Sequence, residues 1–112
     1  MAWIGPPDVA LALGLDPATA DADAWLVQST AAADAWAFTK RAAAGYTDDP
    51  DTVPGADVKQ GTVLYAAALY RDTRGGGDSA ASFDQADMPA VQPAGGMAHV
   101  LRLLHVGKGQ VF

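Results

Sequence analysis

Histidines and clustered aspartates are the side chains in this sequence whose chemistry could support a metal site. His99 and His105 are six residues apart, whereas two histidines that share a zinc ion on one helix face are spaced i, i+4. The chain also has no cysteine, so neither a thiolate ligand nor a disulfide is available. We therefore expect surface or core-edge histidines and no zinc site.

The acidic stretch Asp48-Asp49-Pro50-Asp51 raises the possibility of a calcium loop. Such a loop needs the spacing Asp-x-Asp-x-Asp-Gly and a distal bidentate Glu. The stretch has neither, and all thirteen acidic residues of the chain are Asp. We interpret it as a solvated turn that caps a helix, and we predict no metal.

Catalytic signatures are also missing from the sequence. There is no phosphate-binding loop, nucleophile elbow or paired-histidine zinc motif, and Gly75-Gly76-Gly77 does not follow a predicted strand. We therefore expect neither an enzyme nor a cofactor.

The element that must organise the chain is a helix predicted over residues 58–74. Bulky apolar residues, Leu64, Tyr65 and Leu69, recur at helical spacing with Val58. Asp57 at the start and Arg71 and Arg74 at the end match the helix dipole. Small residues that would let a second helix approach closely are Gly61, Ala66, Ala67 and Ala68.

Two helices are predicted before this one. The first follows Pro6-Pro7 and ends at Gly14, with Val9 and Leu13 as its buried pair. The second covers about residues 21–44, beginning near Thr19 or Asp21.

Tryptophans mark one face of the second helix. Trp25 and Trp36 are eleven residues apart, close to three whole turns, so they share a face. We expect this face to pack against the central helix, in one cluster with Leu64, Tyr65 and Leu69. The alternative is a partly exposed face that a neighbouring copy covers.

After the central helix, residues 75–96 are rich in glycine, serine and proline, with apolar islands around Phe83 and between Met88 and Val91. A stretch of this length favours an extended arm or hairpin. Met97 to His105 returns to helical spacing. Residues 106–112 then form a glycine-hinged, flexible tail with an apolar tip.

Length and charge limit the possible functions. With 112 residues the chain makes one domain, covering residues 1–112, with a modest core. No apolar run is long enough to cross a membrane, and we expect a soluble, unexported protein. The net charge is -6, divided as about -7 over residues 1–57 and +1 over residues 58–112. Such acidity argues against ordinary DNA wrapping. The predicted fold class is all-α, a small bundle of three to four helices with the arm and the tail.

A family resemblance rests on three parts of the chain. These are the central helix from Val58 to Arg71, with its Leu69-Tyr70-Arg71 end, the tryptophan-bearing helix that ends Arg41-Ala42-Ala43-Ala44-Gly45, and the arm that contains Ser82-Phe83-Asp84. Together they resemble the head-to-tail connector (adaptor) proteins of long-tailed bacteriophages.

The resemblance implies a structural protein of the virion neck, which is in the host cytoplasm during assembly. Its copies would form a ring, of twelve subunits, between the portal protein and the next neck protein. Packaged DNA would pass through the centre without sequence-specific binding, and no membrane is involved. On this interpretation, the residues expected to contact partners are Arg71, Arg74, Phe83, Met88, Val91, Lys108, Val111 and Phe112.

A small helical regulator or DNA-binding adaptor is the alternative. A helix-turn-helix protein needs a basic recognition helix, and the central helix has only Lys59 before its last turn. Salt-dependent binding to duplex DNA would favour this alternative over the connector.

Overall fold

The computed structural model describes residues 2–75 and 96–106, and all regular structure within these ranges is helical. The all-α prediction is therefore confirmed for this part of the chain. The predicted arm (residues 75–96) and tail (residues 106–112) lie outside the described residues except at positions 75, 96 and 106, of which Gly75 belongs to α3 and Gly96 to α4. The elements are α1 (Pro6–Leu13), the 3-10 helix η1 (Pro17–Ala22), α2 (Ala24–Ala43), α3 (Ala56–Gly75) and α4 (Gly96–Leu103).

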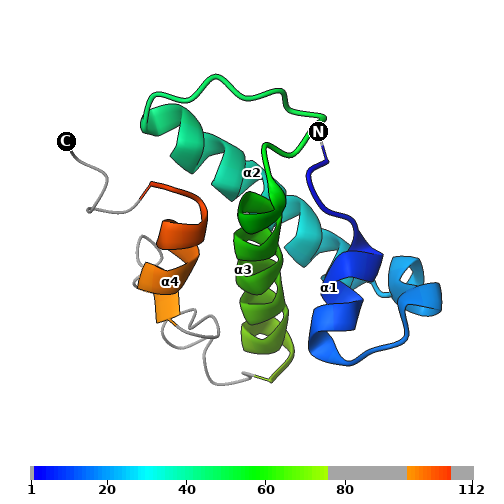
Figure 1. Ribbon diagram of the computed structural model, residues 1–112. Helices are drawn as coiled ribbons and strands as arrows, with labels where there is room; N and C mark the ends of the chain where they lie inside the picture. The colour runs from blue at the N-terminus through cyan, green and yellow to red at the C-terminus, as the bar shows by residue number, and fades with distance from the viewer. Residues whose placement is uncertain (1, 76–95, 107–112) are drawn as a thin grey trace.

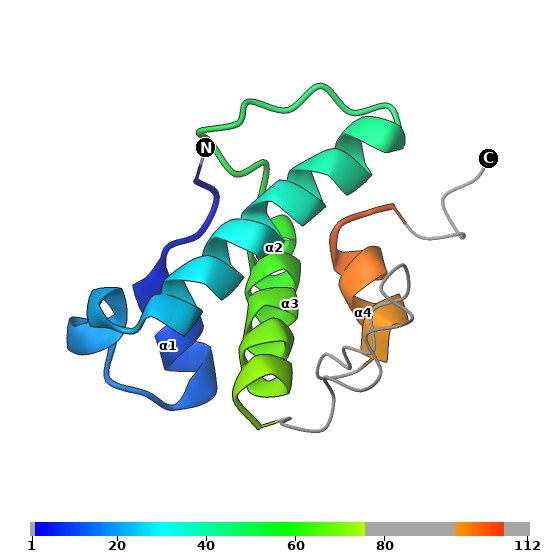
Figure 2. The same ribbon diagram turned by 180° about the vertical axis from the view of Figure 1, so that it is seen from behind.

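The α3 helix is central, as its apolar stripe predicts. It lies between α1 and α4, and α2 crosses behind it (Figure 1). Figure 2 shows α2 in front, running obliquely across α3. The loop of residues 44–55 returns along the top of the molecule to the start of α3. Three helices thus cover α3 from different sides.

Local signals place both ends of α1. The Gly5 N–H donates to the Asp8 carboxylate at 2.9 Å, and Pro6 and Pro7 occupy the first turn, where no N–H bond is lost. Gly14 ends the helix in the left-handed conformation, with φ 76°, which glycine adopts without a steric cost. The predicted α1 is confirmed, with Val9 fully buried and Leu13 partly buried.

The predicted start of the second helix is wrong by a few residues. Residues 17–22 form η1 instead, with the Asp16 side chain accepting the Ala18 N–H at 2.9 Å. The Asp23 carboxylate then accepts the N–H groups of Trp25 and Leu26, which sets the start of α2. The two aspartate caps therefore separate η1 from α2, whereas apolar periodicity alone predicts a helix that starts earlier.

The buried stripe of α2 is not the tryptophan face. Leu26, Ala33 and Ala37 are fully buried, whereas Trp25 remains 48% exposed. Helices that cross at close range place small side chains at the contact, and the alanines serve this purpose. The prediction that both tryptophans lie in the core is therefore wrong for Trp25.

Trp36 does reach the core, at its edge. Its indole stacks on Tyr65 of α3 with ring centroids 3.9 Å apart and an interplanar angle of 16°. Leu64 and Leu69 are partly buried against the same core. The predicted cluster therefore holds for these four residues and excludes Trp25.

The small residues of α3 allow the close contact predicted for them. A Cβ placed on Gly61 would lie 3.0 Å from the Cβ of Leu103 and 3.3 Å from the carbonyl oxygen of Val100, both in α4 or at its end. Ala66, Ala67 and Ala68 are also buried. α4 can therefore approach α3 because position 61 has no side chain.

Candidate binding surface

A shallow groove opens where the start of α2 meets the end of α3. Its volume is about 170 Å³. We call it the Trp25 groove, and the residues that line it are Trp25, Gln28, Ser29, Ala32 and Leu69.

The walls of the Trp25 groove are fixed by contacts between α2 and α3. The Tyr70 hydroxyl donates to the Asp23 carboxylate at 2.7 Å, which ties the end of α3 to the cap of α2. The stack of Trp36 on Tyr65 holds the next stretch of the two helices together. Trp25 and Leu69 therefore stand on two helices whose relative position is set on both sides of the groove.

Several charged residues are close in sequence to the residues that line this groove. Asp21 and Asp23 precede Trp25, and Asp72 follows Leu69 by three residues on the same face of α3. Arg71 is exposed on a neighbouring face of α3. The lining itself is mixed, since the polar side chains of Gln28 and Ser29 join the apolar residues.

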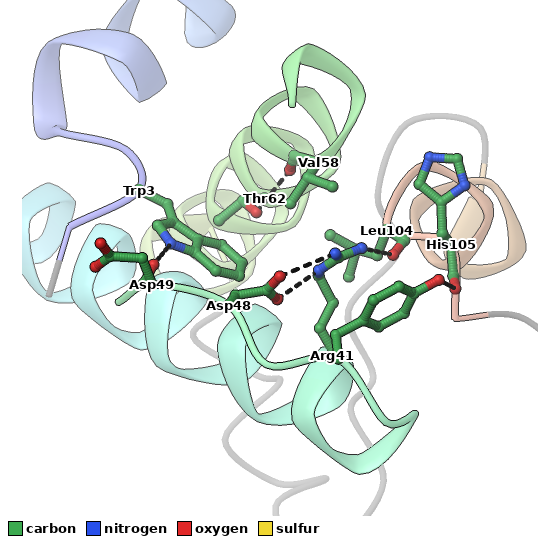
Figure 3. A network of polar contacts seen from close by, with 9 residues as sticks. Trp3, Arg41, Asp48, Asp49, Val58, Thr62, Leu104 and His105 are labelled. Carbon is green, nitrogen blue, oxygen red and sulfur yellow. Dashed lines mark hydrogen bonds and ion pairs between the residues drawn. The ribbon is translucent and has the colours of Figure 1, made fainter. Parts of the chain in front are cut away.

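A second polar cluster fixes α4 at the opposite end of α3. The Arg41 guanidinium donates to both oxygens of the Asp48 carboxylate, at 2.7 and 3.0 Å, and to the carbonyl oxygen of Leu104 at 2.8 Å (Figure 3). The Tyr46 ring lies 3.8 Å below the guanidinium carbon, and its hydroxyl donates to the His105 carbonyl at 3.0 Å. We call these groups the Arg41 network. They join α2, the loop that follows α2 and the end of α4.

The acidic residues of the loop formed by residues 44–55 therefore have a structural role. Asp48 pairs with Arg41, and the Asp49 carbonyl accepts the Trp3 indole N–H at 3.0 Å (Figure 3). The Asp49 side chain accepts the Asp51 N–H at 2.8 Å, as in an aspartate turn. Among residues 2–75 and 96–106, no group of three metal-ligating side chains comes together.

His105 links the end of α4 to the start of α3. Its Nε2 lies 2.7 Å from the Asp57 carboxylate in the first turn of α3, and this bond lowers the pKa of Asp57. His105 has φ 62° just past α4, the left-handed conformation that commonly ends a helix. His99 is only partly buried. Both positions agree with the expected surface or core-edge histidines.

A buried carboxylate holds the N-terminal segment. One oxygen of Asp34, midway along α2, accepts the N–H groups of Trp3 and Ile4 at 3.1 and 3.2 Å. Burial raises the pKa of Asp34 above its usual value, and the two N–H donors oppose this shift. Burial likewise raises the pKa of Tyr65. Asp34 therefore has a structural use that satisfies two backbone groups.

Most of the predicted contact residues are not placed. Phe83, Met88, Val91, Lys108, Val111 and Phe112 lie outside the described residues, and the side chain of Arg74 is also outside them. Arg71 is exposed in the last turns of α3, two residues from Leu69 of the groove. Arg71, the predicted contact residue whose side chain is described, does not line the groove.

Sequence reasoning missed Trp3, Asp34 and the Arg41 network. A signal for two of them exists, because Asp34 and Arg41 are in phase with the buried residues Leu26, Thr30 and Ala37 on α2. A charge on the buried face of a helix predicts a specific partner. The sequence does not identify those partners, because they lie far away along the chain.

Comparison with known proteins gives no relative: no family model, curated protein or solved structure matches the chain. None of the helices in the described ranges has the length and apolar character needed to span a membrane.

Proposed function

We propose that the chain is a ring-forming head-to-tail connector of a tailed phage, bound beneath the portal and forming part of the DNA channel. The observation that carries this proposal is the Trp25 groove, a site lined by apolar and polar side chains on the surface of a small bundle whose helices are otherwise tied together. Trp25 is 48% exposed there. Exposed tryptophan is typical of surfaces that a partner protein covers.

The rigidity of the bundle supports the same proposal. The Arg41 network fixes α4, and Asp34 fixes the N-terminal segment. A ring subunit must keep its shape while it contacts two neighbours and two other neck proteins. The helical architecture and the size of the chain agree with this use. The resemblance of the central helix to head-to-tail connector proteins points to that family.

The charge of the chain supports passage of DNA rather than retention of DNA. A net charge of -6 repels phosphates, so duplex DNA would slide through a lumen lined by such subunits. In this proposal the protein acts through assembly and needs no cofactor or catalytic group.

Loss of the protein from an infected culture tests the proposal. A nonsense codon at Trp25 should leave heads that contain DNA but no attached tails, and wild-type protein supplied from a plasmid should restore tailed particles. Normal tailed particles without the protein would contradict the connector. Salt-dependent binding of the purified protein to duplex DNA, together with normal particles, would favour the regulator.

A further inference from the structure

The C-terminal end of α4 is held by contacts from three other parts of the chain. Arg41 of α2 donates to the Leu104 carbonyl oxygen at 2.8 Å, and the Tyr46 hydroxyl, in the loop after α2, donates to the His105 carbonyl oxygen at 3.0 Å. The His105 Nε2 lies 2.7 Å from the carboxylate of Asp57 in the first turn of α3. Of these three contacts, the last is the one made between an imidazole and a carboxylate, whose charges both depend on pH.

His105 occupies a backbone position that favours glycine. The Val106 N–H donates to the Leu101 carbonyl oxygen and the His105 N–H to the Arg102 carbonyl oxygen, both at 3.0 Å, which is the bonding pattern of a Schellman motif at a helix end. His105 has φ 62° there, a left-handed conformation that is costly for a residue with a Cβ atom. The bond from its imidazole to Asp57 is a contact that glycine could not make and that offsets this cost.

The charge of His105 is the one that acts most strongly on Asp57. The hydrogen bond to His105 is the largest cause that lowers the pKa of Asp57, and the pair is ionic only while the imidazole is protonated. The other titratable or charged side chains at this end of the bundle are Arg41, Tyr46 and Asp48 from α2 and its loop, Lys59 from α3 and Arg102 from α4. Arg41 is paired with Asp48, and Lys59 lies 3.8 Å from Asp8 of α1.

We propose that His105 and Asp57 form a pH-sensitive clasp that holds the end of α4 on the start of α3. A carboxylate whose pKa is lowered by folding contributes stability that is present above its unfolded pKa and is lost as pH falls through its folded pKa. Acid therefore opens the clasp by protonating Asp57. Loss of the imidazole proton as pH rises weakens it from the other side, so the clasp contributes most over an intermediate pH range. This property belongs to a single copy and does not depend on the proposed ring.

A carboxyl NMR titration of the purified full-length chain tests the pair itself. Asp57 should titrate below the ordinary pKa of an aspartate, and His105→Gly should return its titration toward that value. His99→Gln is the matched control, because it replaces the other histidine of the chain and leaves the clasp intact. An Asp57 titration that does not move when His105 is replaced would overturn the clasp.

Hydrogen exchange at the end of α4 tests what the clasp does. Asp57→Asn should speed exchange of the Leu104 and Val106 N–H groups by up to about fivefold where both partners are charged, and should have no such effect below the Asp57 titration. Added to Asp57→Asn, His105→Gly should slow exchange, because glycine relieves the left-handed backbone and no clasp remains to be lost. If Asp57→Asn has the same effect with and without His105→Gly at every pH, the two residues are not coupled and the clasp is refuted.

Discussion

Asp34 shows how a single buried carboxylate can serve the fold. One of its oxygens accepts both the Trp3 and the Ile4 N–H. Its burial raises its pKa, so the charged form costs stability that the protonated form does not. Linkage then gives the sign: between the unfolded pKa and the raised folded pKa the native state binds more protons, and stability falls as pH rises through this window.

The substitution Asp34→Asn separates the charge from the hydrogen bonds. The asparagine carbonyl oxygen can accept both N–H groups without a charge, so the variant should gain stability relative to wild type as pH rises through the raised pKa. Asp34→Ala should instead lose about 1–3 kcal/mol for each N–H left unpaired. Urea unfolding across acidic and neutral pH measures both effects. A stability difference between Asn and Asp that does not change with pH would contradict this account.

Trp25 and Trp36 share a helix and a residue type but differ in their surroundings. Trp36 stacks on Tyr65 at the edge of the core, whereas Trp25 is 48% exposed. Trp36→Ala should cost about 2–5 kcal/mol of unfolding free energy, and Trp25→Ala less than about 1 kcal/mol. Thermal unfolding of the two variants is the measurement. Equal destabilisation would mean that Trp25 belongs to the core after all.

At the scale of elements, the sequence predicts a helix best where local signals and apolar periodicity agree. The paired prolines and Gly14 bound α1, and the apolar stripe gives α3. The start of α2 was misplaced because a 3-10 turn and its Asp16 cap look like the start of a longer helix. The spacing of the tryptophans predicts the wrong buried face, because the small side chains of Ala33 and Ala37 are buried on α2 while Trp25 is exposed.

Long-range polar contacts could not be predicted from the sequence. Arg41 and the Leu104 carbonyl are 63 residues apart in the chain, and Trp3 and the Asp49 carbonyl 46. Nothing local to Arg41 or Asp48 distinguishes a buried bidentate pair from two solvated charges. The Trp25 groove was hidden for the same reason, since Leu69 reaches it from another helix.

The Arg41 network should decide whether α4 stays docked. Arg41→Met leaves the largely buried Asp48 carboxylate and the Leu104 carbonyl without their donor, and the loss of one partner from a buried ion pair costs about 3–5 kcal/mol. We expect destabilisation of this size, with faster hydrogen exchange in α4 than in α1 when measured under native conditions.

Lys59→Met provides the matched control for Arg41→Met. Lys59 lies 3.8 Å from Asp8 in an exposed pair, and such pairs contribute about 0–1 kcal/mol. If the two variants unfold at the same denaturant concentration, the Arg41 network does not hold α4.

At the scale of the whole molecule, the described helices form a bundle with two distinct ends. The Arg41 network and the start of α3 lie at one end, and the Trp25 groove lies at the other. A subunit with unlike ends is suited to head-to-tail contacts, which generate rings or open filaments rather than two-fold dimers. This polarity connects the fold to the connector proposal.

Electron cryo-microscopy of the neck in purified tailed particles tests the connector proposal most directly. The account predicts a closed ring of this helical bundle, of twelve copies, directly beneath the portal and around the DNA, with the Trp25 groove of each copy covered by its neighbour. A neck in which no density fits the bundle, from particles that are fully tailed, would contradict it.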